Sequence, residues 1–435
     1  MGSMKVSFVT FGCKVNQYEE ELMKQLVENA GHTVVKPCEA DIVVFNSCAV
    51  TGEAIRKLKQ KIRHVRRENP DARLMVVGCA VDFDPQELED VEINLLAGNS
   101  LKRKIVELLN AVPFEGIKFE KDLNCEDFVR ESLLKRLRNR TRGMVKVEDG
   151  CDGYCTYCAV RLARGNRVRS KPVGLVIEEI RKLVDSGHRE IVIVGVNLGR
   201  YGVDMGLKLS DLLKVVEKME GDFRVRLSSL NPDDIDEELL DVIREKRFCR
   251  HLHISLQSAS NSVLSLMRRR YRVERFWEIF ERLRKFDPLY SFSFDIMVGF
   301  PGESESDFLE SVELVRRVKP VRVHVFRFSP RRGTPACDMR PQISGAVKKE
   351  RARYLKEIFL VAMHEYLLKH DGVKRRVLVE KVSNGLSSGY DEYYIHNVLN
   401  ESREEGEFVE CFAVSVMKGE EATLSSVPIS GWKVG

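Results

Sequence analysis

The stretch Cys151-Asp-Gly-Tyr-Cys155-Thr-Tyr-Cys158 decides the fold of this chain. Its cysteines have the spacing C-x3-C-x2-C, and three thiolates this close can ligate three corners of a cubic 4Fe–4S cluster and leave its fourth iron open. A zinc ion is the alternative, but a structural zinc site takes four ligands, and the neighbouring sequence offers no fourth Cys or His. The spacing therefore favours an iron–sulfur cluster with one open position.

The chain that follows the triplet alternates strand and helix patterns. Candidate strands lie at 143–148, 190–196, 223–229, 251–257, 292–299 and 321–328. Six such units are fewer than the eight of a closed barrel, so they predict a partial (β/α)6 barrel over 142–345. Its site should face the carboxyl ends of the strands, and the triplet lies just after the first of them.

A second set of cysteines lies in the first hundred residues. The segments 6–13, 41–48 and 73–79 each read as an apolar β-rich run that ends in a cysteine, followed by a helix-like stretch. Such runs predict a doubly wound parallel α/β domain over 4–111, with sites at the carboxyl ends of its strands. We therefore expect Cys13, Cys48 and Cys79 to converge on one edge and to hold an auxiliary cluster, again with three protein ligands. The remaining cysteines have no partner at a useful spacing and are interpreted as structural: Cys38, Cys125, Cys249, Cys337 and Cys411.

The rest of the chain is predicted to connect these domains and to extend them. Residues 112–141 are irregular and then basic, as in a linker, and 346–372 form a polar connecting helix. Short alternating strands broken by glycines predict a small antiparallel β-barrel over 373–435. Its cations and aromatics are typical of RNA binding, by phosphate neutralisation and base stacking: Lys374, Arg375, Arg376, Tyr390, Tyr393 and Tyr394. Other arginines are candidates for RNA contact or for a solvated face: Arg161, Arg164, Arg167, Arg169 and 268–270.

Composition limits the class of protein. The chain has 435 residues, of which 43% are hydrophobic and 31% charged, as in a globular protein of two or three domains. No apolar run of about 18 residues is present to span a membrane, and no secretory signal is recognised, so a cytoplasmic location is expected. Eleven cysteines in such a chain indicate metal or redox chemistry rather than disulfides. The net charge of +5 permits a nucleic-acid partner.

The triplet, with an aromatic just before its third cysteine and an α/β barrel after it, resembles the radical S-adenosylmethionine (SAM) superfamily. In that family the open iron binds the amino and carboxylate groups of SAM, and one electron cleaves SAM into methionine and a 5′-deoxyadenosyl radical. The resemblance implies that residues at successive strand ends line a SAM pocket: Tyr157, Gly195, Asn197, Ser228, Ser229, Gln257 and Val298. Each could instead be an ordinary polar strand end or tight turn.

The order of the two cysteine trios and the final barrel is similar to the methylthiotransferase family over nearly the whole chain, with the last segment similar to the RNA-binding TRAM module. Segments 10–19, 46–51 and 195–202 resemble the MtaB branch of that family. Members of this branch add a methylthio group to carbon 2 of N6-threonylcarbamoyladenosine beside the tRNA anticodon. One departure is that 159–166, Ala-Val-Arg-Leu-Ala-Arg-Gly-Asn, replaces the usual Ile-Pro-Tyr-Ala-Arg-Gly type of sequence.

The resemblance implies two 4Fe–4S clusters and SAM as cofactors, the tRNA anticodon stem-loop as substrate, and an electron donor such as flavodoxin or ferredoxin. Carbon 2 of adenine has an unactivated C–H bond, so a radical cofactor must open it. Isopentenyladenosine in tRNA and a ribosomal-protein side chain remain alternative substrates, although the sequence Lys14-Val15-Asn16 favours the MtaB branch. A non-catalytic iron–sulfur electron carrier or RNA-binding protein is the alternative of another class, for which a barrel with a cofactor-sized pocket would be unnecessary.

Overall fold

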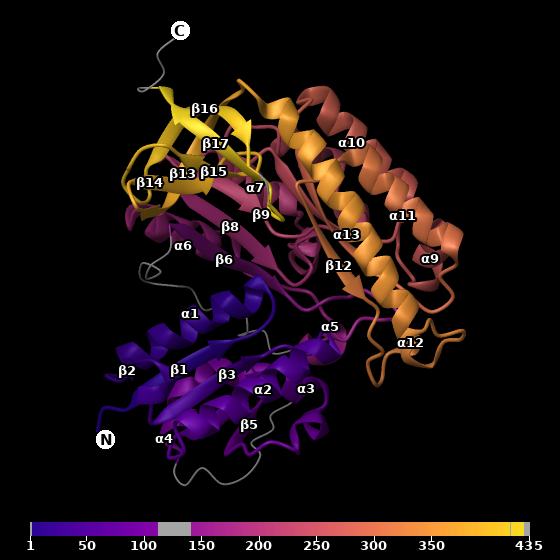
Figure 1. Cartoon of the computed structure of the whole chain (residues 1–435). Coiled ribbons are helices and arrows are strands. Elements are labelled where there is room, and N and C mark those ends of the chain that lie inside the picture. Colours follow the sequence, from indigo (N-terminus) through magenta and orange to yellow (C-terminus); the bar gives the residue numbers. More distant parts are fainter. Residues whose placement is uncertain (1, 112–140, 418, 430–435) are drawn as a thin grey trace.

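Three units follow one another along the chain in the computed structural model (Figure 1). The structure describes residues 2–111, 141–417 and 419–429, so nearly all of the predicted linker, together with Cys125, lies outside the described residues. The N-terminal unit lies below the large central barrel in Figure 1, and the small C-terminal barrel lies above it. Within the described ranges, no helix is both long and apolar enough to cross a membrane.

The N-terminal unit is a five-stranded parallel sheet in the order β2-β1-β3-β4-β5. Its strands are β1 (Lys5–Thr10), β2 (Thr33–Val34), β3 (Ile42–Ser47), β4 (Arg73–Gly78) and β5 (Leu95–Ala97). One face packs on α1 (Lys14–Asn29) and α4 (Ile105–Asn110), and the other on α2 (Gly52–Glu68) and α3 (Cys79–Phe83). Short 3-10 turns complete it: η1 (Pro37–Glu39), η2 (Pro85–Leu88) and η3 (Asn99–Lys104). The doubly wound fold is therefore confirmed.

The helix α2 shows how the sequence places a cysteine at the sheet edge. The Thr51 side chain accepts a hydrogen bond from the Ala54 backbone and caps the helix, which sets its first turn just beyond Cys48. Its apolar face is buried against the sheet through Leu58 and Ile62. Cap and packing together fix the short loop that carries Cys48.

The central unit is a partial barrel of six parallel strands, as expected. They are β6 (Arg142–Asp149), β8 (Glu190–Gly195), β9 (Arg224–Leu227), β10 (His251–Gln257), β11 (Ser291–Val298) and β12 (Arg322–Arg327). A parallel bridge between Leu230 and Ile254 joins the half β6-β8-β9 to the half β10-β11-β12. The two-residue strand β7 (Arg169–Ser170) pairs antiparallel with β6.

Helices connect these strands on the outside of the barrel (Figure 1). They are α5 (Val160–Arg164), α6 (Val173–Asp185), α7 (Leu209–Glu217), α8 (Glu237–Val242), α9 (Asn261–Leu266), α10 (Val273–Phe286), α11 (Glu305–Val318) and α12 (Pro335–Asp338), with 3-10 turns η5 (Leu198–Arg200), η6 (Val203–Met205) and η7 (Pro232–Asp234). The long helix α13 (Gly345–Leu367) packs on α11 and β12 and buries Leu355 and Tyr366 in the barrel core. Through η8 (Leu368–His370) it leads into the last unit.

The last unit is a closed five-stranded barrel in the order β13-β14-β15-β17-β16. Its strands are β13 (Lys374–Ser383), β14 (Leu386–Tyr390), β15 (His396–Leu399), β16 (Phe408–Val416) and β17 (Thr423–Pro428). Four pairs are antiparallel, but β15 and β17 are parallel, which corrects the expectation of an antiparallel barrel. A closed ring with an odd number of strands cannot alternate direction throughout, so one parallel pair is unavoidable.

The small barrel docks on the amino ends of the central strands, opposite the cysteine triplet. Arg142, at the start of β6, forms a two-pronged ion pair with Glu380. Arg224, at the start of β9, donates to the Tyr390 carbonyl at 2.8 Å. The carboxyl ends of the central strands therefore remain free for the site.

Candidate active site

The triplet follows β6 and lies at the carboxyl end of the barrel. Its three cysteines line one cavity of about 280 Å³. Burial, the largest cause, raises the pKa of the Cys151 thiol to about 12, although a backbone hydrogen bond from Gly153 opposes it. Thiolates buried in this way need a bound cation to hold their charge.

A chain of hydrogen bonds connects two of these thiols. Arg269 donates to Cys155 Sγ at 3.3 Å and to Asn231 Oδ1 at 2.5 Å. Asn231 donates to Asn197 Oδ1 at 2.8 Å, and Asn197 donates to Cys151 Sγ at 3.6 Å. Donors directed at sulfur stabilise thiolates and adjust the potential of a cluster. From the sequence, Arg269 was assigned to RNA contact or a solvated face and Asn231 was not singled out, whereas the structure places both in this hydrogen-bond chain beside the thiols.

The structure brings together three of the seven residues expected around SAM. Tyr157, Asn197 and Gln257 line the same cavity as the triplet. The other four end their strands outside its lining: Gly195, Ser228, Ser229 and Val298. Side chains alternate along a strand, so Met297 faces the cavity and its neighbour Val298 faces the core.

Gly195 nevertheless controls the turn that carries Asn197. The buried Glu148 carboxyl accepts a hydrogen bond from the Asn197 backbone at 2.7 Å. A Cβ at Gly195 would lie 2.7 Å from that same carboxyl oxygen, closer than any contact allows. Burial holds the pKa of Glu148 well above its ordinary value, which favours a neutral carboxyl. A side chain at position 195 would therefore force the Glu148 carboxyl to move.

The N-terminal trio also converges. Cys48 and Cys79 lie directly after β3 and β4, and Cys13 precedes α1. A Cβ at Gly12 would lie 2.9 Å from Cys48 Sγ, so the Cys13 loop runs against that thiol. Burial first, and then the Cys79 and Cys13 thiols, raise the pKa of Cys48 to about 12. Asn99, which the sequence did not reveal, donates to Cys79 Sγ at 3.6 Å.

The spacing within both trios fits a cluster better than a single ion. Four thiolates on one zinc lie about 4 Å apart, since each Zn–S bond is about 2.3 Å. Among the described residues, His253, Asp295 and His324 form a trio whose ligand atoms all lie within 4.8 Å of one another. Within the same described ranges, the sulfur atoms of neither cysteine trio are that closely spaced. A cube of irons separates its ligands further, so both donor sets suit 4Fe–4S clusters with an open iron.

The loop that follows Cys48 reaches the cavity at the triplet. Val50 and Thr51, which follow Cys48, line it together with the triplet. Behind them, Cys79 packs on Ala163 in α5, the helix that follows the triplet. The N-terminal unit and the triplet therefore share the wall of one cavity.

A buried network of charges joins the two units behind the cavity. Glu19 of α1 accepts from Arg164 at 2.7 and 2.9 Å, from Lys102 at 2.6 Å and from Lys146 at 2.8 Å. Burial, the largest single effect, raises the pKa of Glu19, but the three cations together outweigh it and hold the pKa well below its ordinary value. Arg164 therefore acts within the protein, and its predicted exposure to solvent or RNA is wrong.

Other cations assigned to RNA are also used internally. Arg375 is fully buried and pairs with Asp391 at 2.6 Å. Arg169 is buried beside Asp149 at 3.5 Å. Arg376 pairs with Asp222 of the central unit at 2.7 Å. The expectation of phosphate contact is therefore wrong for Arg375 and Arg169, because burial removes them from any RNA.

The tyrosines of the small barrel contact the central unit. The Arg226 guanidinium lies 3.3 Å from the centroid of the Tyr394 ring, and Tyr390 stacks on Tyr394 at 4.7 Å. Tyr393 donates to Asp287 at 3.1 Å. Their predicted role as RNA-stacking surfaces is wrong in this arrangement, because the rings dock one unit on the other.

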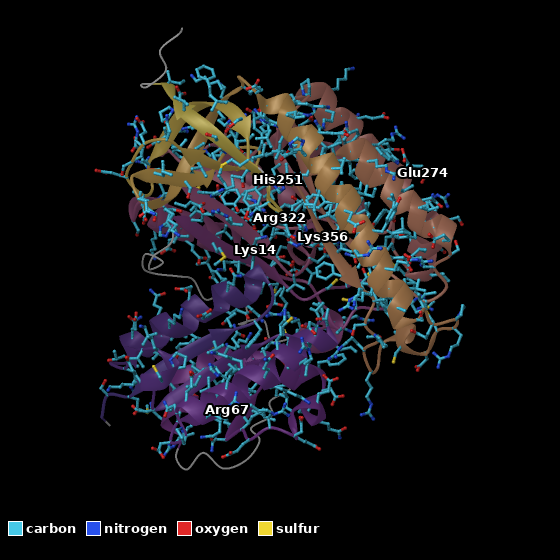
Figure 2. All side chains as sticks on the ribbon, in the orientation of Figure 1. Lys14, Arg67, His251, Glu274, Arg322 and Lys356 are labelled. Carbon is cyan, nitrogen blue, oxygen red and sulfur yellow. The ribbon has the colours of Figure 1, made fainter. Side chains whose placement is uncertain are left out.

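Polar side chains line the lumen of the central barrel next to the cavity at the triplet. Figure 2 shows Lys14, Arg322 and His251 gathered between the N-terminal unit and the two barrels, and their charges act on one another. Asp295 accepts from His253 at 3.1 Å. The surrounding cations disfavour a divalent ion at the His253, Asp295 and His324 trio.

This barrel, with three cysteines after its first strand, defines the chain as a radical SAM enzyme. Residues 145–315 match the Radical SAM superfamily, and residues 5–98 match the Uncharacterized protein family UPF0004. A solved structure of the radical SAM methyltransferase TsrM from Kitasatospora setae shares the fold, with a TM-score of 0.57 and 14% identity over 77% of this chain and 75% of that one.

Proteins of similar sequence show to which family of radical SAM enzymes the chain belongs. The chain is 45% identical over 392 residues to the threonylcarbamoyladenosine tRNA methylthiotransferase MtaB of Thermotoga maritima, covering 90% of each. It is 35% identical to the MtaB of Aquifex aeolicus over 89% of this chain and 95% of that one. It is 34% identical to the tRNA-2-methylthio-N(6)-dimethylallyladenosine synthase of Moorella thermoacetica, over 86% of each. The chain belongs to the methylthiotransferase family, in its MtaB group, and its cofactors are SAM and 4Fe–4S clusters.

Proposed function

We propose that this enzyme adds a methylthio group to carbon 2 of N6-threonylcarbamoyladenosine next to the anticodon of tRNA. The observation that carries the proposal is one cavity lined by the triplet and by Val50 and Thr51, the residues that follow Cys48. Removal of the hydrogen and delivery of sulfur must occur at the same carbon, so both donor sets have to reach one bound base. The 45% identity to a relative named for this nucleoside supports the choice of substrate.

We assign Cys151, Cys155 and Cys158 to the cluster that binds SAM, and the N-terminal trio to a second cluster that handles sulfur. When bound, SAM on its cluster supplies a carbon radical able to open the C–H bond at carbon 2. Asn197, Tyr157 and Gln257 would orient SAM where they line the cavity. The buried Glu19 and Arg164 pair would hold the two donor sets at a fixed separation.

The anticodon stem-loop is the proposed partner, with a low-potential electron donor such as flavodoxin or ferredoxin and a cytoplasmic location. We propose that the TRAM-like barrel over 373–435 contacts RNA through its other exposed cations, because Arg375 is buried in an ion pair with Asp391 and Arg376 pairs with Asp222 of the barrel over 142–345. Lys374 and Lys381 remain exposed there. The helix over 346–372 and the linker over 112–141 would connect these parts.

The decisive experiment compares anticodon hairpins that carry threonylcarbamoyladenosine or isopentenyladenosine. The reconstituted enzyme is incubated anaerobically with SAM, a reductant and a sulfur source, and the nucleosides are identified by mass spectrometry. We expect the methylthio product from the threonylcarbamoyl hairpin. Product from the isopentenyl hairpin alone, or from a ribosomal protein alone, would refute the proposal.

Cysteine variants test the assignment of the two clusters. Alanine at Cys13, Cys48 and Cys79 should abolish methylthio transfer and leave 5′-deoxyadenosine formation measurable. Alanine in the 151–158 triplet should abolish both products. A folded N-terminal variant that no longer cleaves SAM would contradict this division.

A further inference from the structure

The barrel lumen contains a buried arginine with unused hydrogen-bond donors. Arg226 alternates with Val225 and Leu227 along β9, so the pleat turns its side chain into the lumen. It is 3% exposed, yet its Nε and Nη1 have no hydrogen-bond partner among the described residues. The Tyr394 ring packs against the guanidinium, whose Cζ lies 3.3 Å from the ring centroid.

Two neighbouring groups share this property. Ser228 Oγ, next on the same face of β9, and His251 Nδ1 on β10 are also buried and find no partner in the described part of the chain. A buried polar atom without a partner costs about 1–3 kcal/mol. Several on one face of one lumen indicate a place for a polar ligand. Because a guanidinium only donates, that ligand must present acceptor oxygens.

The charges around Arg226 favour an anion. A cavity of about 280 Å³ is lined by Lys14, Arg142, Arg226 and Glu380, among others. Glu380 is engaged by Arg142. Lys14 forms no ion pair within the described ranges, and burial first, and then Arg226, lower its pKa to about 7. Arg226 is therefore the permanent cation that this lining leaves without a carboxylate of its own.

The nearest other carboxylates are already engaged. Glu190 accepts from Arg224 at 2.7 Å, and Asp295 accepts from His253 at 3.1 Å. Asp295 also lines the cavity at the triplet, and its charge acts on Lys14. The cationic cavity therefore lies toward the amino ends of β6 and β9, beside the small barrel, and the charge of Asp295 at the triplet cavity acts on its Lys14.

We propose that Arg226, assisted by Lys14, binds the free carboxylate of the threonylcarbamoyl group and so selects this nucleoside. The inference rests on the proposed function and names its specificity determinant. Threonine is joined to the carbamoyl group through its amine, which leaves its carboxylate as an anion at the end of the substituent. A dimethylallyl substituent has no hydrogen-bond acceptor, so it would leave Arg226 buried and unpaired. The free-energy cost of that unpaired guanidinium would discriminate strongly against the dimethylallyl nucleoside.

The test removes the charge from the ligand first. Anticodon hairpins are prepared with threonylcarbamoyladenosine or with its neutral threonine carboxamide, and binding to the cluster-loaded enzyme is measured. We expect the wild-type enzyme to bind the carboxamide about 30-fold or more weakly, as for loss of one partner of a buried charged pair. Equal binding of the two hairpins would overturn the inference, and this comparison needs no variant to fold.

The second arm removes the charge from the protein. Arg226→Gln should lose the same factor on the carboxylate hairpin and should no longer distinguish the carboxamide. Arg67→Gln is the matched control, because Arg67 lies on the outer side of the N-terminal unit, away from Lys14 and His251 (Figure 2), and it should behave as wild type. SAM cleavage without RNA should be unchanged in Arg226→Gln.

The outcomes separate the inference from the function on which it rests. If Arg226→Gln weakens both hairpins and SAM cleavage equally, the arginine serves the cofactor or the fold and the inference is wrong. If the wild type methylthiolates the threonylcarbamoyl hairpin without regard to its carboxylate, only the inference falls. If it acts on the isopentenyl hairpin alone, both fall.

Discussion

Arg164 of the central barrel grips Glu19 of the N-terminal unit with two hydrogen bonds, at 2.7 and 2.9 Å. The same guanidinium donates to Asn16 Oδ1 at 2.7 Å. Asn16 in turn donates to the Phe11 and Ser47 carbonyls, each at 2.8 Å, in the loops that carry Cys13 and Cys48. One arginine just after the triplet therefore positions two loops of the other trio.

The first prediction concerns the stability of this junction. Glu19→Gln leaves Arg164, Lys102 and Lys146 buried without their shared anion, and breaking a buried pair in this way costs about 3–5 kcal/mol. Urea unfolding of the cluster-loaded protein should show the loss. Glu178→Gln is the control, because Glu178 pairs with Lys182 on the solvent-exposed surface, where water screens the interaction and its loss should leave the midpoint unchanged. Equal midpoints for the two variants would show that the network contributes little.

The second prediction is the pH dependence of that difference. Because the folded pKa of Glu19 is depressed, its contribution is complete above its ordinary value of 4.5 and declines as pH falls from there through the folded value. The stability gap between wild type and Glu19→Gln should therefore be constant near neutrality and shrink below about pH 4.5. Unfolding curves across this range measure it. A gap that widens in acid would reverse the assigned sign.

The third prediction is the iron content. Reconstituted protein should hold about eight irons, and alanine at all three cysteines of either trio should leave about four. Iron analysis and the absorbance of the remaining cluster give the count. Cys337→Ala offers a matched control, because Cys337 belongs to neither trio, and it should retain about eight irons. Eight irons in either triple variant would refute the assignment.

The sequence predicted those features of the fold that depend on one strand or helix alone. Buried parallel strands are rich in apolar residues, so the run within 41–48 could be recognised, and the cysteine that ends it marked the strand end. The helix-like stretch expected after the second cysteine likewise corresponds to α2, whose apolar face is buried. These signals are local, and the structure places each element within a few residues of its expected position.

The partners of charged residues could not be predicted in the same way. Arg164 and Glu19 are 145 positions apart in the sequence. The sequence pattern of the arginines after the triplet is the same whether they face water or pair with a distant carboxylate. The prediction that Arg375 contacts RNA was wrong for the same reason, because its partner Asp391 could not be identified from the sequence. Arg226 did leave a signal, because it alternates with Val225 and Leu227, and an arginine in that register of a central strand faces an enclosed lumen.

The final prediction tests the turn that follows β8 and carries Asn197. In Gly195→Ala the new Cβ would lie 2.7 Å from the Glu148 carboxyl oxygen and 3.1 Å from the Leu198 Cα. The carboxyl must then move and release the Asn197 backbone, and Asn197 would lose its position against Cys151. We expect SAM affinity and 5′-deoxyadenosine formation to fall about tenfold or more, since a displacement of about 1 Å in a site can cost about 100-fold. Gly174→Ala is the control, because a Cβ there meets no atom within 4 Å and alanine favours the helix α6. Both variants are compared by SAM binding to protein of matched iron content, so that loss of the cluster is not mistaken for loss of the turn. Normal SAM binding by Gly195→Ala would show that the turn tolerates a side chain and that Asn197 is held by other contacts.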